Sequence, residues 1–151
     1  MSNFRIQDSN FETRVRESFA RQIIMRTIGA QMTKVEAGAV EIELPFRADL
    51  TQQHGFLHAG IVTTIVDSAC GYAAFSLMPA GTGVLTVEYK VNLLAPAKGE
   101  KLTARGRVSK AGRTLTFCEG EVIAFNEGKE SRIATMMATL MTIRDRPDVM
   151  D

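Results

Sequence analysis

This chain of 151 residues has almost no excess of charge of either sign, and it has few metal-binding side chains. It carries 18 Lys and Arg against 17 Asp and Glu, a formal net charge of +1, so no broad field of one sign points to a nucleic-acid partner. Its two histidines and two cysteines lack the spacing of a metal site, which predicts no bound metal. No Gly-rich phosphate loop is present either, so any anion must be held by a local cluster.

Long uncharged apolar segments are also missing. The N-terminal 18 residues contain no apolar signal core, which favours a cytoplasmic protein. The most apolar stretch, 61–78, is about as long as a membrane span, but Asp67 at its middle would be costly in a bilayer. Cys70 and Cys118 lie in apolar surroundings and are expected to be reduced. We therefore predict one soluble domain over 1–151, with polar termini at about 1–9 and 145–151.

Hydrophobic periodicity predicts the α+β class. Apolar residues recur at every fourth position from Phe11 to Ile23, which indicates an N-terminal helix over about 10–25. A second, very apolar helix is expected at about 58–77, after a polar loop at 47–57. Alternating segments predict strands at about 29–35, 39–46, 84–94, 101–108, 114–125 and 131–143, the last three joined by turns at 110–113 and 126–129. We expect a curved antiparallel sheet of five or six strands wrapped around the apolar central helix.

His58, Ala59 and Gly60 stand where the polar loop becomes the apolar helix. The first turn of a helix leaves backbone N–H groups unpaired and carries partial positive charge. Small residues at 59 and 60 leave room for a substrate carbonyl to reach those groups, as in an oxyanion hole. The alternative is that Ala59 and Gly60 only permit close packing.

Asp67 is the second candidate, because a carboxylate inside an apolar run must be hydrogen-bonded or have its charge suppressed. It is either a structural residue held by backbone donors or a general base or nucleophile. It lies nine positions after His58, which on one helix is a rise of roughly 13–14 Å and a phase difference of about half a turn. If both serve one site, Asp67 must come from a second subunit, and a two-fold dimer would then hold two identical sites.

A longer pattern of residues carries a family resemblance. The segment Gln52-x-x-Gly55-x-x-His58-Ala59-Gly60-x6-Asp67 resembles the signature of hotdog-fold acyl-CoA thioesterases, closest to the PaaI-like branch named for phenylacetate degradation. Segments 83–88, 94–100 and 112–114 are similar to the strand, bend and hairpin turn that follow the helix in that family. The resemblance covers about 10–144 and implies one hotdog domain.

The resemblance implies roles for matching residues. The backbone N–H of Ala59 would polarise the thioester carbonyl, beside Gly60, and Asp67 of the neighbouring subunit would attack it or activate water. Gln52 would lie near the thioester or the water, His58 would orient the loop or touch the thioester, and Thr86 would lie near the water. The usual His-Gly-Gly is His-Ala-Gly here, which keeps the N–H but adds a methyl group that bears on substrate range.

Partners and alternatives follow from the same reading. Lys110, Gly112 and Arg113 form a short basic turn that either holds coenzyme A phosphates or is simply solvated. The predicted reaction is hydrolysis of an acyl- or aryl-CoA by a homodimer, expected to assemble into a homotetramer, with no cofactor other than the coenzyme A of the substrate. The alternatives are a hotdog protein that binds acyl-CoA without turnover, as a sensor or carrier, and a hydratase or dehydratase, for which no second acid–base pair is visible.

Overall fold

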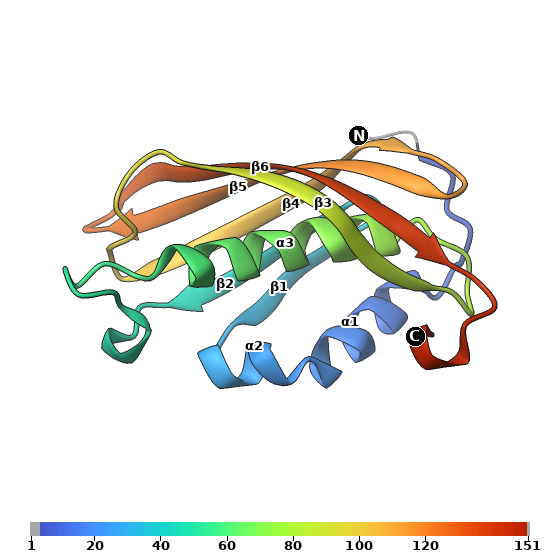
Figure 1. Ribbon diagram of the computed structural model, residues 1–151, viewed down its shortest axis with the longest axis horizontal. Helices are drawn as coiled ribbons and strands as arrows, with labels where there is room; N and C mark the ends of the chain where they lie inside the picture. The colour runs from blue at the N-terminus through green and yellow to red at the C-terminus, as the bar shows by residue number, and fades with distance from the viewer. Residues whose placement is uncertain (1–3, 151) are drawn as a thin grey trace.

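The computed structural model describes residues 4–150 and shows a single curved sheet folded over one central helix (Figure 1). The sheet has six strands in the order β1-β2-β4-β5-β6-β3, and every neighbouring pair is antiparallel. Its strands are β1 (Gln31–Glu36), β2 (Ala39–Pro45), β3 (Gly83–Leu93), β4 (Lys101–Ala111), β5 (Leu115–Asn126) and β6 (Lys129–Ile143). The predicted α+β class and curved antiparallel sheet are confirmed.

The central helix α3 (Ala59–Phe75) lies along the inside of the sheet. Its packing face includes Ile65, Val66 and Ala69, all with no exposed surface. Gly106 of β4 and Gly120 of β5 are paired opposite each other beneath it. A Cβ at Gly106 would lie 2.3 Å from the Ala69 carbonyl carbon, so only glycine lets the helix approach this closely.

One stripe of α3 remains partly open to solvent, although the sequence predicted a helix enclosed on most sides. The stripe consists of small and polar residues at helical spacing: Gly60, Thr63, Thr64, Asp67, Ser68 and Gly71. Strand β3 at the neighbouring sheet edge is exposed along most of its length, including Leu85, Val87, Tyr89 and Leu93, each about half exposed. The apolar face predicted for this strand is therefore not buried within one chain.

The N-terminal helix is present, but it is divided in two. Helix α1 (Phe11–Arg21) and helix α2 (Ile23–Ile28) are separated by Gln22, whose backbone is extended at φ −70° and ψ 103°. The Gln22 side-chain amide donates to the Tyr72 hydroxyl at 3.1 Å, a tertiary bond that helical periodicity cannot reveal. Helix α2 ends at Gly29, whose left-handed φ of 81° delays the start of β1 to residue 31.

Smaller differences concern the chain ends and one turn. Lys110 continues β4 instead of starting the turn, and the hairpin turn is confined to 112–114. Within the predicted polar C-terminus, Pro147–Val149 form a 3-10 turn whose last carbonyl oxygen lies beside Gly83. Residues 1–3 and 151 of the expected polar termini lie outside the described residues. Cys70 and Cys118 are buried free thiols, as predicted.

Candidate active site

The loop before α3 is tied down on both sides of the helix start. Residues 48–50 form a 3-10 turn, and Thr51 bridges to Leu57. The Leu57 N–H donates to the Ala97 carbonyl at 2.8 Å, and the His58 N–H donates to the Leu50 carbonyl at 3.0 Å. These bonds fix the direction from which the chain enters the helix.

His58 is the N-cap residue of α3. Its ring Nδ1 accepts the Gly60 N–H at 2.8 Å, and its carbonyl accepts the N–H groups of Ile61 at 2.9 Å and Val62 at 3.2 Å. Within residues 4–150 the Ala59 N–H has no partner, so it is the first-turn donor left for a ligand. The helix dipole adds partial positive charge at this position.

A pocket of about 380 Å³, here the Ala59 pocket, is lined by Ala59. Gln52 is one of its lining residues; its side-chain Oε1 accepts the His54 N–H, and its Nε2 has no partner in the described part of the chain. The remaining walls are mostly apolar, from Val62, Leu94 and Pro96 among others. Two unused N–H donors in an apolar cleft are suited to bind a carbonyl oxygen.

Asp67 is half-buried at the middle of the open stripe of α3. Its Oδ1 accepts a hydrogen bond from the Thr86 hydroxyl of β3 at 2.8 Å. Burial raises the pKa of the Asp67 carboxyl above its ordinary value, and the Thr86 hydrogen bond offsets part of that rise. Both residues line a second pocket of about 280 Å³, here the Asp67 pocket. A raised carboxyl pKa is typical of a group that exchanges a proton near neutrality.

Ala59 and Asp67 lie in different pockets of the same chain. Asp67 lies eight positions after Ala59, roughly 12 Å along α3. Gly60 does share a groove of about 500 Å³ with Asp67, which follows the open stripe beside Tyr89 and Val91 of β3. The structure thus brings Gln52 to Ala59 and brings Thr86 to Asp67, and leaves these two pairs apart within one subunit.

A basic pocket of about 600 Å³ lies near the C-terminal end of α3. Gly112 and Arg113 line it, as do Arg5 and Arg144, two residues that the sequence analysis did not select. Arg144 Nη1 donates to the Arg113 carbonyl at 3.0 Å. Lys110 is exposed in β4 and is not part of this lining. Only the pairing of distant segments brings these arginines together, so no sequence pattern signals the cluster.

The position of the basic pocket relative to Asp67 follows from strand register. Leu140 of β6 pairs with Thr86 of β3, and Arg144 follows Leu140 by four residues, toward the start of β3. At about 3.3 Å per residue, the backbone of Arg144 lies roughly 13 Å along the sheet from Leu140, the strand partner of Thr86. An extended ligand can therefore contact both places.

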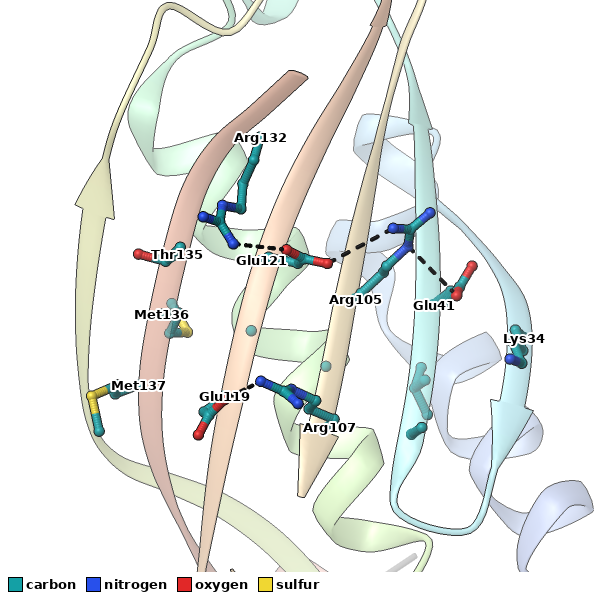
Figure 2. A pocket seen from close by; sticks show the side chains of 14 residues that line it. Lys34, Glu41, Arg105, Arg107, Glu119, Glu121, Arg132, Thr135, Met136 and Met137 are labelled. Carbon is teal, nitrogen blue, oxygen red and sulfur yellow. Dashed lines mark hydrogen bonds and ion pairs between the residues drawn. The ribbon is translucent and has the colours of Figure 1, made fainter. Parts of the chain in front are cut away.

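The outer face of the sheet carries another hollow, of about 610 Å³ (Figure 2). Its charges pair with one another across the strands: Arg105 lies 3.6 Å from Glu41 and 3.7 Å from Glu121. Figure 2 shows Arg107 paired with Glu119 in the same way. The three carboxylates of this lining, Glu41, Glu119 and Glu121, are all held in ion pairs with arginines. Within residues 4–150 no cluster of His, Cys, Asp and Glu could hold a metal ion, and no helix is long and apolar enough to cross a membrane.

Comparison with known proteins identifies the family. The profile of the thioesterase superfamily matches residues 54–131, just over half of the chain. A relative from Saccharolobus solfataricus, named as a candidate esterase, is 31% identical over 87% of this chain and 85% of its own length. Acyl-coenzyme A thioesterase 13 of Homo sapiens is 31% identical over 69% of this chain and 75% of its own length.

Solved structures agree with this assignment. A thioesterase family protein from Silicibacter pomeroyi superimposes with a TM-score of 0.88 at 55% identity, over 89% of this chain and 98% of that one. PaaI of E. coli superimposes with a TM-score of 0.80 over 91% of this chain and 96% of that one, and at 17% identity this likeness concerns the fold. The chain therefore belongs to the thioesterase superfamily. It is a thioester hydrolase with the PaaI-like hotdog fold that the motif predicted.

Proposed function

We propose that this hydrolase cleaves acyl-CoA thioesters to a free acid and coenzyme A. The observation that carries the proposal is the unpartnered Ala59 N–H at the start of α3, in one pocket with the unpartnered Gln52 Nε2. A thioester carbonyl oxygen bound there gains negative charge in the transition state, and donors fixed in advance stabilise that charge more than they stabilise the ground state.

Asp67 supplies the second half of the reaction. As a general base it takes a proton from water, the hydroxide adds to the carbonyl carbon, and the carbon–sulfur bond then breaks. The proton returns to the leaving thiolate, so that acid and thiol are released. As a nucleophile, the carboxylate adds to the carbonyl carbon and the carbon–sulfur bond breaks, which releases the thiolate to be protonated; water then opens the resulting anhydride to the free acid and Asp67. The Thr86 hydroxyl, 2.8 Å from Asp67 Oδ1, orients the carboxylate in either route.

We propose that Asp67 acts on a thioester held by Ala59 of a second subunit. The separation of the two residues along α3 supports this proposal, and so do two surfaces. Strand β3 is a sheet edge with exposed Leu85, Tyr89 and Leu93, which favours pairing with another copy. The open stripe of α3 carries small residues that allow a second helix to approach. We expect the resulting dimers to pair into a tetramer.

The coenzyme A phosphates are assigned to the basic pocket of Arg5, Arg113 and Arg144. Guanidinium groups match phosphate geometry, and the pocket lies past the end of β6, the strand whose Leu140 pairs with Thr86. Gly112 lines the pocket without a side chain that would obstruct the phosphates. Lys110 lies outside the lining and contributes only long-range positive charge. No further cofactor is needed, and we propose that the enzyme works in the cytoplasm, where it meets acyl-CoA.

Thiol release from a panel of acyl-CoA esters, followed with a chromogenic disulfide, tests the proposal. We expect turnover by the native protein and a loss of about 10²–10⁴-fold in kcat for Asp67→Asn. Binding of acyl-CoA without thiol release would favour the sensor or carrier alternative. An Asp67→Asn protein that keeps more than about half of the native rate would show that the carboxylate is structural, since loss of a general base costs far more.

A further inference from the structure

The segment before α1, residues 4–8, has no regular secondary structure, yet it forms one wall of the basic pocket. In Figure 1 this N-terminal segment, in dark blue, runs past the end of the fold where α3 ends. Its Arg5 side chain lines the pocket and has no hydrogen-bond or ion-pair partner within residues 4–150. Because neither a helix nor a strand holds the segment, side-chain contacts must determine where Arg5 lies.

Two of these contacts come from Phe4 and Gln7, which lie before and after Arg5 in the chain. A Cβ at Gly38 would lie 2.8 Å from the Phe4 ring, so the ring rests directly on the Gly38 backbone. The Gln7 Nε2 donates to the Leu77 carbonyl at 2.8 Å. Both contacts therefore join the N-terminal segment to the folded domain on either side of Arg5.

The third contact is an ion pair between Asp8 and Arg14 of α1. Arg14 Nε donates to Asp8 Oδ2 at 2.9 Å, and the side chains of Arg14 and Asp8 are only 10% and 13% exposed. Arg14 Nη2 also donates to the Met78 carbonyl at 2.8 Å, and the guanidinium lies 4.1 Å from the centroid of the Phe75 ring. Arg14 thus holds Asp8 against the C-terminal end of α3, the helix that carries Asp67.

We propose that Asp8 and Arg14 are positioning residues for coenzyme A, which hold the N-terminal segment so that Arg5 meets a phosphate; this inference rests on the proposed acyl-CoA hydrolysis. Neither Asp8 nor Arg14 lines the basic pocket, so both act through Arg5. A guanidinium that is held in place before binding gives higher affinity, because the entropy of ordering the segment was lost on folding. The structural alternative is that the ion pair only closes the end of the core.

Calorimetric binding of coenzyme A to the full chain tests the inference. Arg5→Ala should raise the Kd at least about tenfold, the effect of one charge-assisted hydrogen bond. Asp8→Asn leaves one oxygen where Asp8 uses two, on the Asn10 N–H at 2.9 Å and on Arg14 Nε, so one of these bonds is lost. This variant should raise the Kd about three- to tenfold, because Arg5 then spends only part of its time beside the phosphate.

The double variant separates a positioning role from a structural one. If Asp8 acts through Arg5, Asp8→Asn should change the Kd of the Arg5→Ala protein by less than about twofold. Two effects that multiply in full would show that Asp8 acts independently of Arg5 and would overturn the inference. Glu12→Gln is the matched control, because it breaks an exposed ion pair with Arg16 on the same helix and should leave the Kd unchanged.

Gln7→Ala gives a second test that leaves the ion pair intact. Gln7 is exposed, so its replacement does not endanger folding. Loss of its hydrogen bond to the Leu77 carbonyl should raise the Kd of coenzyme A about two- to fivefold. For Gln7→Ala and Asp8→Asn alike, KM for acyl-CoA should rise, while kcat and the KM of a short thioester without the nucleotide stay within about twofold.

The possible outcomes distinguish this inference from the proposed hydrolysis. Unchanged binding of coenzyme A by both Asp8→Asn and Gln7→Ala, with a raised KM for Arg113→Ala, would refute the positioning role and keep the coenzyme A site. Weaker binding by these variants without thiol release by the native protein would refute hydrolysis and keep the positioning role. Equal losses on acyl-CoA and on the short thioester would show that Asp8 supports the fold as a whole, which contradicts the inference.

Discussion

Replacing Ala59 with proline removes the backbone donor assigned to the oxyanion and leaves the helix start intact. Ala59 is the first residue of α3, a position where proline is well tolerated because its N–H has no helical partner. The residue before a proline must be extended, and His58 already is, with φ −60° and ψ 139°. The variant should therefore fold, keep the His58 cap on Gly60 and retain its oligomeric state.

The expected loss follows from the number of donors in the pocket. Ala59 N–H and Gln52 Nε2 are the two unpartnered donors identified in the Ala59 pocket, so proline leaves one of them. Loss of one oxyanion donor typically costs about 10²–10³-fold in kcat, or about 2.7–4 kcal/mol of transition-state stabilisation. KM should change much less, since the ground-state carbonyl carries little charge.

Steady-state thiol release, with circular dichroism and light scattering as checks on folding and assembly, measures this effect. Ala59→Val matches the bulk of proline and keeps the N–H, whereas Ala59→Gly keeps the N–H and removes the methyl group. We expect Ala59→Gly to retain activity within a few-fold and to accept bulkier acyl groups, because one methyl-sized contact is worth only about 1–3 kcal/mol of discrimination. Equal losses for proline and valine would assign the effect to bulk, and a folded, fully active Ala59→Pro protein would refute the oxyanion role.

Three further outcomes follow from the charged groups of the site. Thr86→Val removes the hydrogen bond that lowers the pKa of Asp67, so the acid limb of the kcat/KM profile should move to higher pH; an unmoved limb would separate Thr86 from the titrating base. Burial raises the pKa of the folded Asp67 above its unfolded value, so ionised Asp67 destabilises the fold at neutral pH and this cost disappears below the unfolded pKa. Asp67→Asn should accordingly raise Tm at neutral pH but not below about pH 3, and a lower Tm at neutral pH would contradict this. Arg113→Ala and Arg144→Ala should raise KM for CoA esters but not for a short thioester lacking the nucleotide, with Lys110→Ala as the weaker control; equal effects on both substrates would point to folding.

Local patterns were sufficient to predict most of the fold. The apolar run ending near Pro79 predicted α3 to within two residues at each end, and the glycine-containing turns predicted the β4–β5 and β5–β6 hairpins. The break at Gln22 was not predicted, because no proline or glycine marks it and the stabilising bond comes from Tyr72, 50 residues away. The exposure of β3 was also missed, since alternation shows which side chains share a face but not whether that face is covered within one subunit.

The candidate site also has features that the sequence predicted and features that it could not predict. Spacing alone showed that His58 and Asp67 cannot meet within one chain, and the motif pointed to Ala59. The sequence could not show that the His58 ring accepts the Gly60 N–H, because this depends on the conformation of the His58 side chain. That hydrogen bond leaves the Ala59 N–H as the donor without a partner in residues 4–150. Arg5 and Arg144 reach the basic pocket through the packing of the N-terminal segment and the register of β6, which no local pattern encodes.

Mixing two inactive variants tests the shared site directly. In a dimer of one Ala59→Pro subunit and one Asp67→Asn subunit, one site combines native Ala59 with native Asp67, and the other site contains both substitutions. Random assembly makes half of the dimers mixed, so coexpression should restore about a quarter of native activity if each site spans two subunits. Separately tagged subunits allow the mixed dimer to be purified and assayed at about half of native activity per dimer. A site confined to one subunit gives no recovery, because every subunit then lacks one of the two groups.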